Sequence, residues 1–432
     1  MLFSAAARCR IAEKRPTLNE LGRQPLQRQG PTCYCPLTMP CVSGWSNPRL
    51  KGRIPELDGL RGLAILLVLF WHYFISNTRV GMGTWEAYAL VPFRLFWSGV
   101  DLFFVLSGFL IGGILYDAKE SDTYYKPFYL RRIYRIFPIY FMWIALFFVG
   151  LCVVGPHSSS SLRALFNRDI PAWSYPLFLQ NFFTPSHGFG PRWMAITWSL
   201  AVEEQFYLLL PLFIRRLSYR GIAKLALASI VAAPIVRLIL WWSGNVYSGP
   251  YTLFFCRTDA LGFGVLIAIA CRNRRAWAWL ESHRAHLYAA FLALGCGVGL
   301  FTLRQRYLYV FGLTWIAGFY ASLLLLTVVN PGRIETFIFR SLLLSRLGTV
   351  SYAVYLFHQG INALFHLAIF GEQPAIVGWS TIGVTVLSLL TVLLLSAISW
   401  QFLEKPLIRH AHSTYQYAVV TETPSRRTPC AP

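Results

Sequence analysis

The amino-acid sequence predicts an all-α fold: a polytopic transmembrane helical bundle of about ten spans, with both termini in the cytoplasm. Hydrophobic residues make up 56% of the 432 residues and charged residues only 13%. A soluble domain of this size carries about 25% charged residues. The apolar residues also fall in long runs, and residues 377–403 contain no Asp, Glu, Lys, Arg or His. A helix needs roughly 20 apolar residues to cross the hydrocarbon core of a membrane.

Ten apolar stretches are predicted to span the membrane. They are residues 60–76, 97–116, 136–154, 197–214, 222–242, 252–271, 285–302, 307–329, 348–370 and 376–403. The stretch 173–183 is too short to cross, so we expect it to lie at the interface or to re-enter the membrane. The polar flanks then predict a disordered N-terminal extension over 1–50, a membrane domain over 51–408, and a disordered C-terminal tail over 409–432.

The net charge of +21 follows from the loops between the spans. Alternate loops hold 20 Lys and Arg residues on one side of the membrane and seven on the other. Basic loops stay in the cytoplasm, which puts both termini there. The same rule is enough to account for the basic charge, so a nucleic-acid partner is not predicted. No C-x-x-C pair or Cys/His ligand spacing occurs, so neither a metal site nor a structural disulfide is predicted.

Ionisable residues inside the spans are candidates for function, because a charge near the bilayer centre costs at least about 2.5–3.5 kcal/mol. At about 1.5 Å of rise per residue, candidates from different helices fall at similar depth. Polar groups that avoid lipid at one depth predict a common polar cavity. The candidates are His72, Asp101, Glu203, Glu204, Arg237, Arg257, Asp259 and His358.

The first span carries Asp58, Arg61 and His72. At 100° per residue, the eleven residues from Arg61 to His72 return to within about 20° of the starting face. Arg61 at the cytoplasmic mouth and His72 deep inside are then expected to face the same groove. This pattern is typical of a substrate entry path that has a general base at its end. The alternative is that the Arg61 side chain extends to the membrane surface to keep its charge hydrated, and that the His72 side chain faces inward and only packs against its neighbours.

Three arginines, Arg131, Arg132 and Arg135, stand at the cytoplasmic start of the third span. Arg132 and Arg135 share one helix face. The planar guanidinium suits phosphate, because it donates two parallel hydrogen bonds. The alternative is an anchor that only follows the positive-inside rule.

Two adjacent carboxylates, Glu203 and Glu204, lie in apolar surroundings on the fourth span. Desolvation and mutual repulsion make them candidates to orient or to protonate a histidine. The alternative is an ion pair with one of the intramembrane arginines.

Two further pairs lie close together along the chain. Tyr355 and His358 are one helical turn apart, and a functional His358 and a His358 hydrogen-bonded in the bundle core remain equal alternatives. Arg257 and Asp259 are close enough in sequence to satisfy each other.

Seven sequence blocks follow one another between residues 54 and 408. The first, 54–72, contains Arg61, ten further residues and then His72; the second, 100–111, contains Asp101 and Ser107. The others are 131–140, 198–207, 257–264, 351–358 and 402–406. This ordered set resembles the acyltransferase-3 family of integral membrane O-acyltransferases.

The resemblance implies transfer of an acyl group, usually acetyl from acetyl-CoA, to a hydroxyl of a glycan or a related extracytoplasmic acceptor. It implies that His72 is the catalytic residue, that Arg61 is its partner, and that Arg132 and Arg135 contact CoA. Other polar residues are expected to bind substrate or support the site: Asp58, Asp101, Ser107, Arg257, Asp259, Tyr355 and His358.

The sequence therefore predicts a membrane O-acetyltransferase of a bacterial inner membrane. Acyl-CoA would be the co-substrate, and the acceptor would be a cell-envelope or exported carbohydrate such as lipopolysaccharide. His72 would act as the base, with Glu203 or Glu204 orienting its imidazole. The alternative is a transporter of a polar or lipid-linked solute, since transporters also hold ionisable groups at the midplane. A purely structural scaffold would leave the costly intramembrane charges unexplained.

Overall fold

The computed structural model describes residues 47, 50, 52, 54–78, 88–155, 157–303, 307–329 and 332–418. Apart from Asn47 and Leu50, the predicted N-terminal extension lies outside the described residues, as does 419–432 of the predicted tail. Several loop residues that decide the predicted orientation also lie outside them: Lys51, Arg53, Arg79, Arg304 and Arg306. The cytoplasmic placement of both termini therefore stays a prediction.

In the described ranges the regular structure is helical, with one isolated bridge between Thr78 and Ile376 and no strand. The longer helices follow the predicted spans one by one. They are α1 (Pro55–Phe70), α3 (Gly99–Asp117), α4 (Tyr125–Val153), α7 (Thr197–Arg216), α8 (Tyr219–Trp242), α10 (Thr258–Ala270), α12 (Arg284–Leu303), α13 (Leu313–Val328), α15 (Leu342–Phe370) and α16 (Trp379–Ser399). Three π-helical turns adjoin them: η2 (Trp71–Ile75), η9 (Leu308–Gly312) and η10 (Trp400–Glu404).

Eight helical stretches in the described chain are long and apolar enough to cross a membrane. The helix α10 is apolar but shorter, and α7, which carries Glu203 and Glu204, is not among the eight. The predicted all-α membrane bundle is confirmed, and the count of about ten spans stays a prediction.

The outward face of α8 has the character of a lipid-facing surface. Leu227, Val231, Ile235 and Ile239 recur every four residues and are each more than half exposed. An exposed apolar stripe of this length is unfavourable in water and favourable against lipid tails.

Short helices and turns connect the long ones. They are α5 (Ser160–Leu165), α6 (Thr184–His187), α9 (Ser248–Thr252), α11 (Arg274–Ser282), α14 (Arg333–Phe339), α17 (Lys405–Thr414), η3 (Val91–Phe93), η4 (Phe96–Ser98), η5 (Ala172–Ser174), η6 (Gln180–Phe182) and η7 (Phe254–Cys256). The segment 173–183, predicted to lie at the interface or to re-enter, folds into η5 and η6. The Gln180 side chain is buried there and donates to the Thr197 carbonyl at 2.8 Å.

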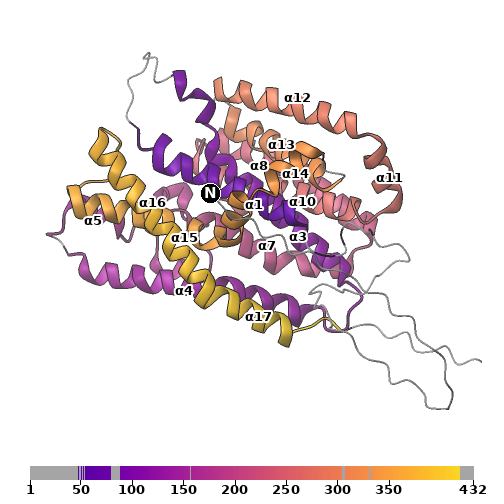
Figure 1. Ribbon diagram of the computed structural model, residues 1–432, viewed down its shortest axis with the longest axis horizontal. Helices are drawn as coiled ribbons and strands as arrows, with labels where there is room; N and C mark the ends of the chain where they lie inside the picture. The colour runs from indigo at the N-terminus through magenta and orange to yellow at the C-terminus, as the bar shows by residue number, and fades with distance from the viewer. Residues whose placement is uncertain are drawn as a thin grey trace, which may run out of the picture. The chain divides into compact units, whose positions relative to one another are not determined.

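The helix α1 packs between α15 and α3 near the centre of the bundle (Figure 1). Two glycines bring the backbones of α1 and α15 into contact. A Cβ on Gly62 would stand 2.0 Å from the Leu344 oxygen, and a Cβ on Gly348 would stand 1.8 Å from the Asp58 oxygen. No larger side chain fits at either position, so the helices approach closely, as small residues allow in membrane bundles.

The predicted disorder over 409–432 is wrong for residues 409–414, which are helical. Residues up to Thr414 belong to α17, which runs beside α4, and the described chain continues to Ala418 (Figure 1). Arg131 of α4 holds this end, because its Nε donates to the Tyr415 carbonyl at 2.7 Å and its guanidinium lies 5.1 Å from the centre of the Tyr417 ring. The segment is too polar to resemble a span, and its order depends on these tertiary contacts.

Candidate active site

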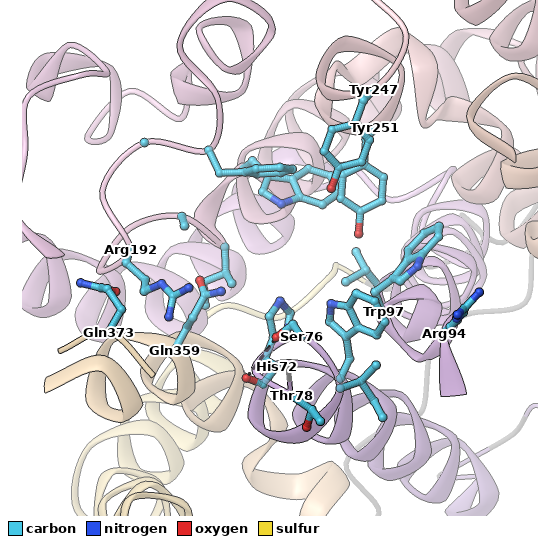
Figure 2. A pocket seen from close by; sticks show the side chains of 18 of the residues that line it. His72, Ser76, Thr78, Arg94, Trp97, Arg192, Tyr247, Tyr251, Gln359 and Gln373 are labelled. Carbon is cyan, nitrogen blue, oxygen red and sulfur yellow. Dashed lines mark hydrogen bonds between the residues drawn. The ribbon is translucent and has the colours of Figure 1, made fainter. Parts of the chain in front are cut away.

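A cavity of about 1210 Å³ lies beside the π-helical turn η2 (Figure 2). Aromatic rings from several segments form much of its wall. The Trp198 and Tyr251 rings lie 4.6 Å apart, and the Trp97 and Tyr251 rings meet edge to face at 5.2 Å. Further aromatic lining comes from Trp71, Tyr88, Phe189, Tyr247, Tyr309 and Tyr355.

His72 stands at the wall of this cavity, within η2 (Figure 2). The turn is closed by a hydrogen bond from the Ser76 amide to the Trp71 carbonyl at 2.9 Å, and the His72 carbonyl accepts from Asn77 Nδ2 at 2.7 Å. The spacing of 100° per residue assumed between Arg61 and His72 therefore ends at Phe70. Single π-helical turns occur frequently at functional sites.

His72 contacts His358 of α15, and we call these two residues the histidine pair. Nδ1 of His72 lies 3.0 Å from the Val68 carbonyl oxygen and 3.3 Å from Nε2 of His358. Nδ1 of His358 lies 2.6 Å from the Tyr355 carbonyl oxygen, and the Tyr73 hydroxyl donates to the His358 carbonyl at 3.0 Å. His358 is fully buried, whereas His72 reaches the cavity.

These contacts assign the tautomers of the histidine pair. A carbonyl oxygen only accepts, so Nδ1 of His358 carries the hydrogen and its Nε2 holds a lone pair. By the same argument Nδ1 of His72 carries a hydrogen, which the Val68 carbonyl and His358 Nε2 share. The unprotonated nitrogen of His72 is therefore Nε2, which forms no hydrogen bond in the described part of the chain.

Tyr355 also lines the cavity, one turn before His358 on α15. Its hydroxyl lies 2.6 Å from Ser199 Oγ and donates to the Ile196 carbonyl at 3.2 Å. These bonds fasten α15 to the beginning of α7 and fix the position of the phenol ring.

A second group of predicted residues gathers around Arg61, Arg132 and Arg135, which we call the guanidinium cluster. The three cations lie within electrostatic range of one another, and Arg61 pairs with Asp58 at 3.3 Å. Glu203 lies within range of all three. Repulsion among three close cations in a low-dielectric region is offset only by nearby or bound anions.

A hydrogen bond connects Glu203 of α7 to α3, and neither acid of α7 is hydrogen-bonded to His72 among the described residues. Ser107 donates to Glu203 at 2.5 Å and lies 3.2 Å from the Tyr207 hydroxyl. Glu204 lies within electrostatic range of Glu203 and Arg132, and its Oε1 is buried without a hydrogen-bond partner among the described residues.

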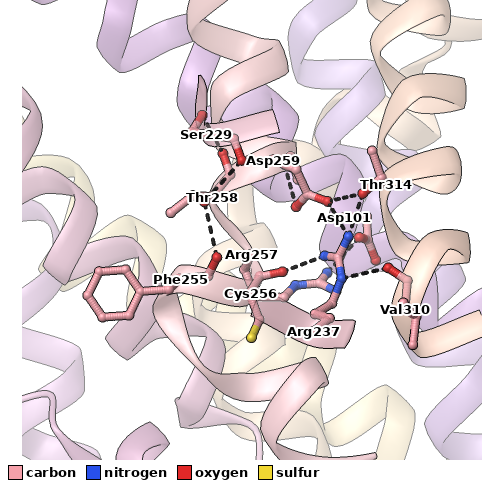
Figure 3. Close-up of polar contacts among 11 residues, drawn as sticks. Asp101, Ser229, Arg237, Phe255, Cys256, Arg257, Thr258, Asp259, Val310 and Thr314 are labelled. Atoms are coloured by element: carbon pink, nitrogen blue, oxygen red, sulfur yellow. Dashed lines mark hydrogen bonds and ion pairs between the residues drawn. The ribbon is translucent and has the colours of Figure 1, made fainter. Parts of the chain in front are cut away.

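Four further candidates form a buried ion cluster, which consists of Asp101, Arg237, Arg257 and Asp259 (Figure 3). Arg237 Nη2 lies 2.9 Å from Asp259 Oδ2, and Arg257 Nη2 lies 2.5 Å from Asp101 Oδ1. None of the four is more than 1% exposed. The predicted pairing of Arg257 with Asp259 is thus replaced by pairs that connect α10 to α8 and to α3.

Arg237 is the most completely bonded side chain of the buried ion cluster. Nε donates to the Val310 carbonyl at 2.9 Å and Nη1 donates to the Cys256 carbonyl at 2.5 Å. Thr314 donates to Asp259 at 2.6 Å and also contacts Arg237. This bonding is what an intramembrane charge requires to avoid its desolvation cost.

The single polar cavity predicted for all eight intramembrane candidates is wrong. Of the eight, only His72 lines the cavity, and Tyr355 is the only other predicted site residue that does so. The expected contact between His72 and Glu203 or Glu204 is also absent among the described contacts, since His358 and Val68 occupy that position. Depth along a helix does not determine the direction of a side chain, so residues at one height face different gaps between helices.

Sequence reasoning missed the polar residues that share the cavity with His72. Arg192, Gln359 and Gln373 line it at the end where His72 stands (Figure 2). Gln359 directly follows His358, which was the only local signal for it. Arg192 is one of the seven basic residues counted in the loops opposite the cytoplasm. Nothing in its local sequence distinguishes it from the other arginines of those loops.

Comparisons with known proteins agree with the sequence blocks. An acyltransferase-domain family model matches residues 54–401. The peptidoglycan O-acetyltransferase OatA of Listeria monocytogenes is 27% identical over 379 residues, which cover 84% of this chain and 57% of that protein. The O-acetyltransferase OatA of Staphylococcus aureus is 24% identical over 391 residues, covering 84% of this chain and 58% of that protein.

The chain therefore spans somewhat more than half the length of these relatives. No solved structure is significantly similar to it. The family match covers most of the chain and begins one residue before α1. On these grounds the chain is a multi-pass membrane protein that belongs to the acyltransferase family.

Proposed function

We propose that this protein is a membrane O-acetyltransferase that transfers acetyl from cytoplasmic acyl-CoA to a hydroxyl of a cell-envelope carbohydrate. Family membership and the names of the relatives support the reaction class. The observation that carries the proposal is the free Nε2 of His72 at the wall of a cavity of about 1210 Å³. Ligand pockets of about 300–1,000 Å³ already hold small molecules, so this cavity has room for a sugar unit.

In the proposed reaction His72 is a general base. Its Nε2 removes the proton from the acceptor hydroxyl while that oxygen attacks the thioester carbonyl carbon. The carbon–sulfur bond then breaks, CoA leaves as its thiolate, and the thiolate takes the proton from the imidazolium. The Val68 carbonyl and His358 Nε2 accept from Nδ1 throughout, so His358 takes the orienting role first expected of Glu203 or Glu204.

The guanidinium cluster is the proposed binding region for the phosphates of CoA. Arg61 lies eleven residues before His72, which is about 16 Å along the helix axis. The extended arm of CoA suits such a separation between its phosphates and its thioester. Arg132 Nε is buried without a hydrogen-bond partner among the described residues, as expected of a donor kept for a ligand. Arg131 instead holds the C-terminal segment.

The aromatic wall of the cavity supports a carbohydrate acceptor. Sugar rings present C–H faces that pack on flat aromatic rings, while their hydroxyl groups need polar partners at the edges. Tyr247, which is 43% exposed, and the half-buried Trp71 and Tyr309 offer ring surface, and Gln359 and Gln373 offer such partners. With the orientation predicted from loop charges, the cavity opens in the outer half of a bacterial inner membrane, where envelope carbohydrates are accessible.

The test is acetyl transfer by the purified full-length protein in lipid nanodiscs. Radiolabelled acetyl-CoA would be supplied with peptidoglycan fragments or with O-antigen oligosaccharides. We expect His72→Ala to lower the transfer rate by about 10²–10⁴-fold, the usual contribution of a general base, without changing acetyl-CoA binding. His286→Ala, which changes an exposed histidine on α12, is the matched control. A correctly inserted His72→Ala protein that transfers acetyl at the wild-type rate would contradict the mechanism.

A further inference from the structure

The two ends of the cavity differ in chemistry. Trp97, Tyr247 and Tyr251 line one side, and Arg192 and Gln359 stand at the end beside His72 (Figure 2). No Asp or Glu occurs among the described lining residues, whereas two arginines do. Arg192 therefore puts positive charge within electrostatic range of the proposed base, whereas Arg94 stands beside Trp97 on the other side (Figure 2).

Arg192 differs from the intramembrane arginines in having no partner. Among the described residues, its guanidinium forms neither an ion pair nor a hydrogen bond, and it lies within electrostatic range of His72. Partial burial lowers the pKa of the Arg192 guanidinium, because no nearby anion offsets the lost hydration. By contrast, Arg237 and Arg257 each hold a carboxylate at hydrogen-bond distance.

The backbone around Arg192 is held firmly, so its position is a feature of the fold. The Arg192 amide donates to the Ala164 carbonyl at 3.0 Å. The next residue, Trp193, stacks on Trp143 with ring centres 4.0 Å apart. Two residues earlier, Gly190 adopts φ +70°, a left-handed conformation that favours glycine.

Gln359 supplies a second unused polar group at the same end. Its Oε1 is buried and has no hydrogen-bond partner among the described residues. A buried acceptor without a partner is unfavourable unless a ligand or water satisfies it. The Gln359 side chain lines the cavity, and the residue directly follows His358.

We propose that the acceptor is an acidic sugar, whose anionic group pairs with Arg192 while the hydroxyl to be acylated is presented to His72. The anion is a carboxylate or a phosphate ester, since both match the planar fork of a guanidinium. Gln359 Oε1 accepts a hydrogen bond from a neighbouring hydroxyl or amide of the same sugar. This inference rests on the proposed function and names the class of its acceptor.

The test compares acceptors that differ only in charge. The wild-type protein in nanodiscs would receive a glucuronic-acid-containing oligosaccharide, its neutral glucose counterpart and a phosphorylated counterpart, each with radiolabelled acetyl-CoA. We expect kcat/KM to favour the anionic acceptors by about 10- to 100-fold, as charge-assisted hydrogen bonds to one arginine allow. The ratio between the two anionic acceptors tells a carboxylate from a phosphate ester.

Variants of Arg192 then locate the source of the preference. Arg192→Gln is expected to bring the ratio of anionic to neutral acceptor close to one, and Arg192→Lys to keep part of it because the charge remains. Arg168→Gln, which changes an exposed arginine in the same outer loop, should leave the ratio unchanged. Equal use of charged and neutral acceptors by the wild type would overturn the proposal. So would an equal loss on both acceptors in Arg192→Gln, which would instead assign Arg192 to the oxyanion of the transition state.

A binding measurement separates this inference from the proposed function. Fluorescently labelled versions of the same three oligosaccharides would be titrated into the protein without acetyl-CoA. If no acetyl is transferred to any acceptor, the proposed function fails, and tighter binding of the acidic oligosaccharides that is lost in Arg192→Gln would still support an acidic-sugar site. Equal binding of all three would overturn it.

Discussion

The buried ion cluster and the histidine pair are two polar sites inside the same bundle, and they differ in whether they reach the cavity. The charges of the buried ion cluster are paired, although Asp101 Oδ2 and Arg257 Nε and Nη1 are buried without hydrogen-bond partners among the described residues. In the buried ion cluster each arginine holds an aspartate at 2.9 Å or less, and no member of the cluster lines the cavity. In the histidine pair, His358 is buried while His72 reaches the cavity with an unused nitrogen. Both sites place ionisable residues inside the bundle, and on sequence alone this makes each of them a candidate for function.

The difference teaches that an intramembrane charge is a weaker sign of function than an intramembrane lone pair facing open space. The buried ion cluster is formally neutral and ties α10 to α8 and α3, which is a structural role. The histidine pair joins the π-helical turn η2 to α15 and leaves Nε2 of His72 without a hydrogen bond among the described residues. Three predictions test whether the buried ion cluster contributes mainly to folding stability and the histidine pair mainly to activity.

The largest effect is expected from breaking one ion pair. Asp101→Ala would leave Arg257 buried without its carboxylate, which costs about 3–5 kcal/mol of folding free energy. We expect a large fall in the thermal unfolding midpoint in detergent, while the activity per folded molecule stays close to that of the wild type. Asp169→Ala, at an exposed loop carboxylate, is the control. A normal midpoint combined with lost activity would assign the buried ion cluster to catalysis.

A smaller effect is expected from His358, which acts as a positioning residue. His358→Leu removes the acceptor for His72 Nδ1, and a hydrogen bond of this kind contributes about 0.5–1.5 kcal/mol, or up to about tenfold in rate. We expect kcat to fall while the KM for acetyl-CoA stays constant. His358→Gln keeps an acceptor oxygen and should recover part of the rate. An unchanged kcat in His358→Leu would mean that the Val68 carbonyl alone holds the His72 tautomer.

The smallest effect is expected when the Asp101–Arg257 pair is replaced as a whole. The double variant Asp101→Leu with Arg257→Met removes both charges and preserves volume, and such replacements are often neutral or stabilising. We expect an unfolding midpoint and an acetyl-transfer rate near those of the wild type. Loss of transfer in a stable double variant would show that this pair contributes more than packing.

Much of the fold follows from the sequence, because a long hydrophobic run forms a helix in a bilayer. Backbone polar groups must be satisfied inside each segment, so an apolar run such as 377–403 becomes a helix wherever it lies. The starts of α4 and α15 were placed too late, at 136 and 348 instead of 125 and 342. The residues before the predicted starts include Lys126 and three arginines in α4, and Ser345 and Arg346 in α15, and an apolar-run criterion stops at such residues.

The sequence also located the histidine of the first span, because an ionisable side chain in an apolar run is conspicuous and the Arg61–His72 spacing resembles a known family. It could not assign the neighbours of His72. Glu203 was the plausible orienting acid by chemistry, and His358 holds that position because Gly62 and Gly348 bring α1 and α15 together. The packing of one helix on another depends on many side chains at once, which no single motif encodes.

The sequence alone therefore determined the all-α membrane bundle, the family and the types of polar residue available for a site. Only the tertiary structure decided which polar groups neutralise one another and which remain open to a ligand. The physical reason is that apolar periodicity and helix formation are local properties of the chain. The direction of each polar side chain depends instead on helix rotation and on close contacts between distant segments, as in the π-helical turn that carries His72.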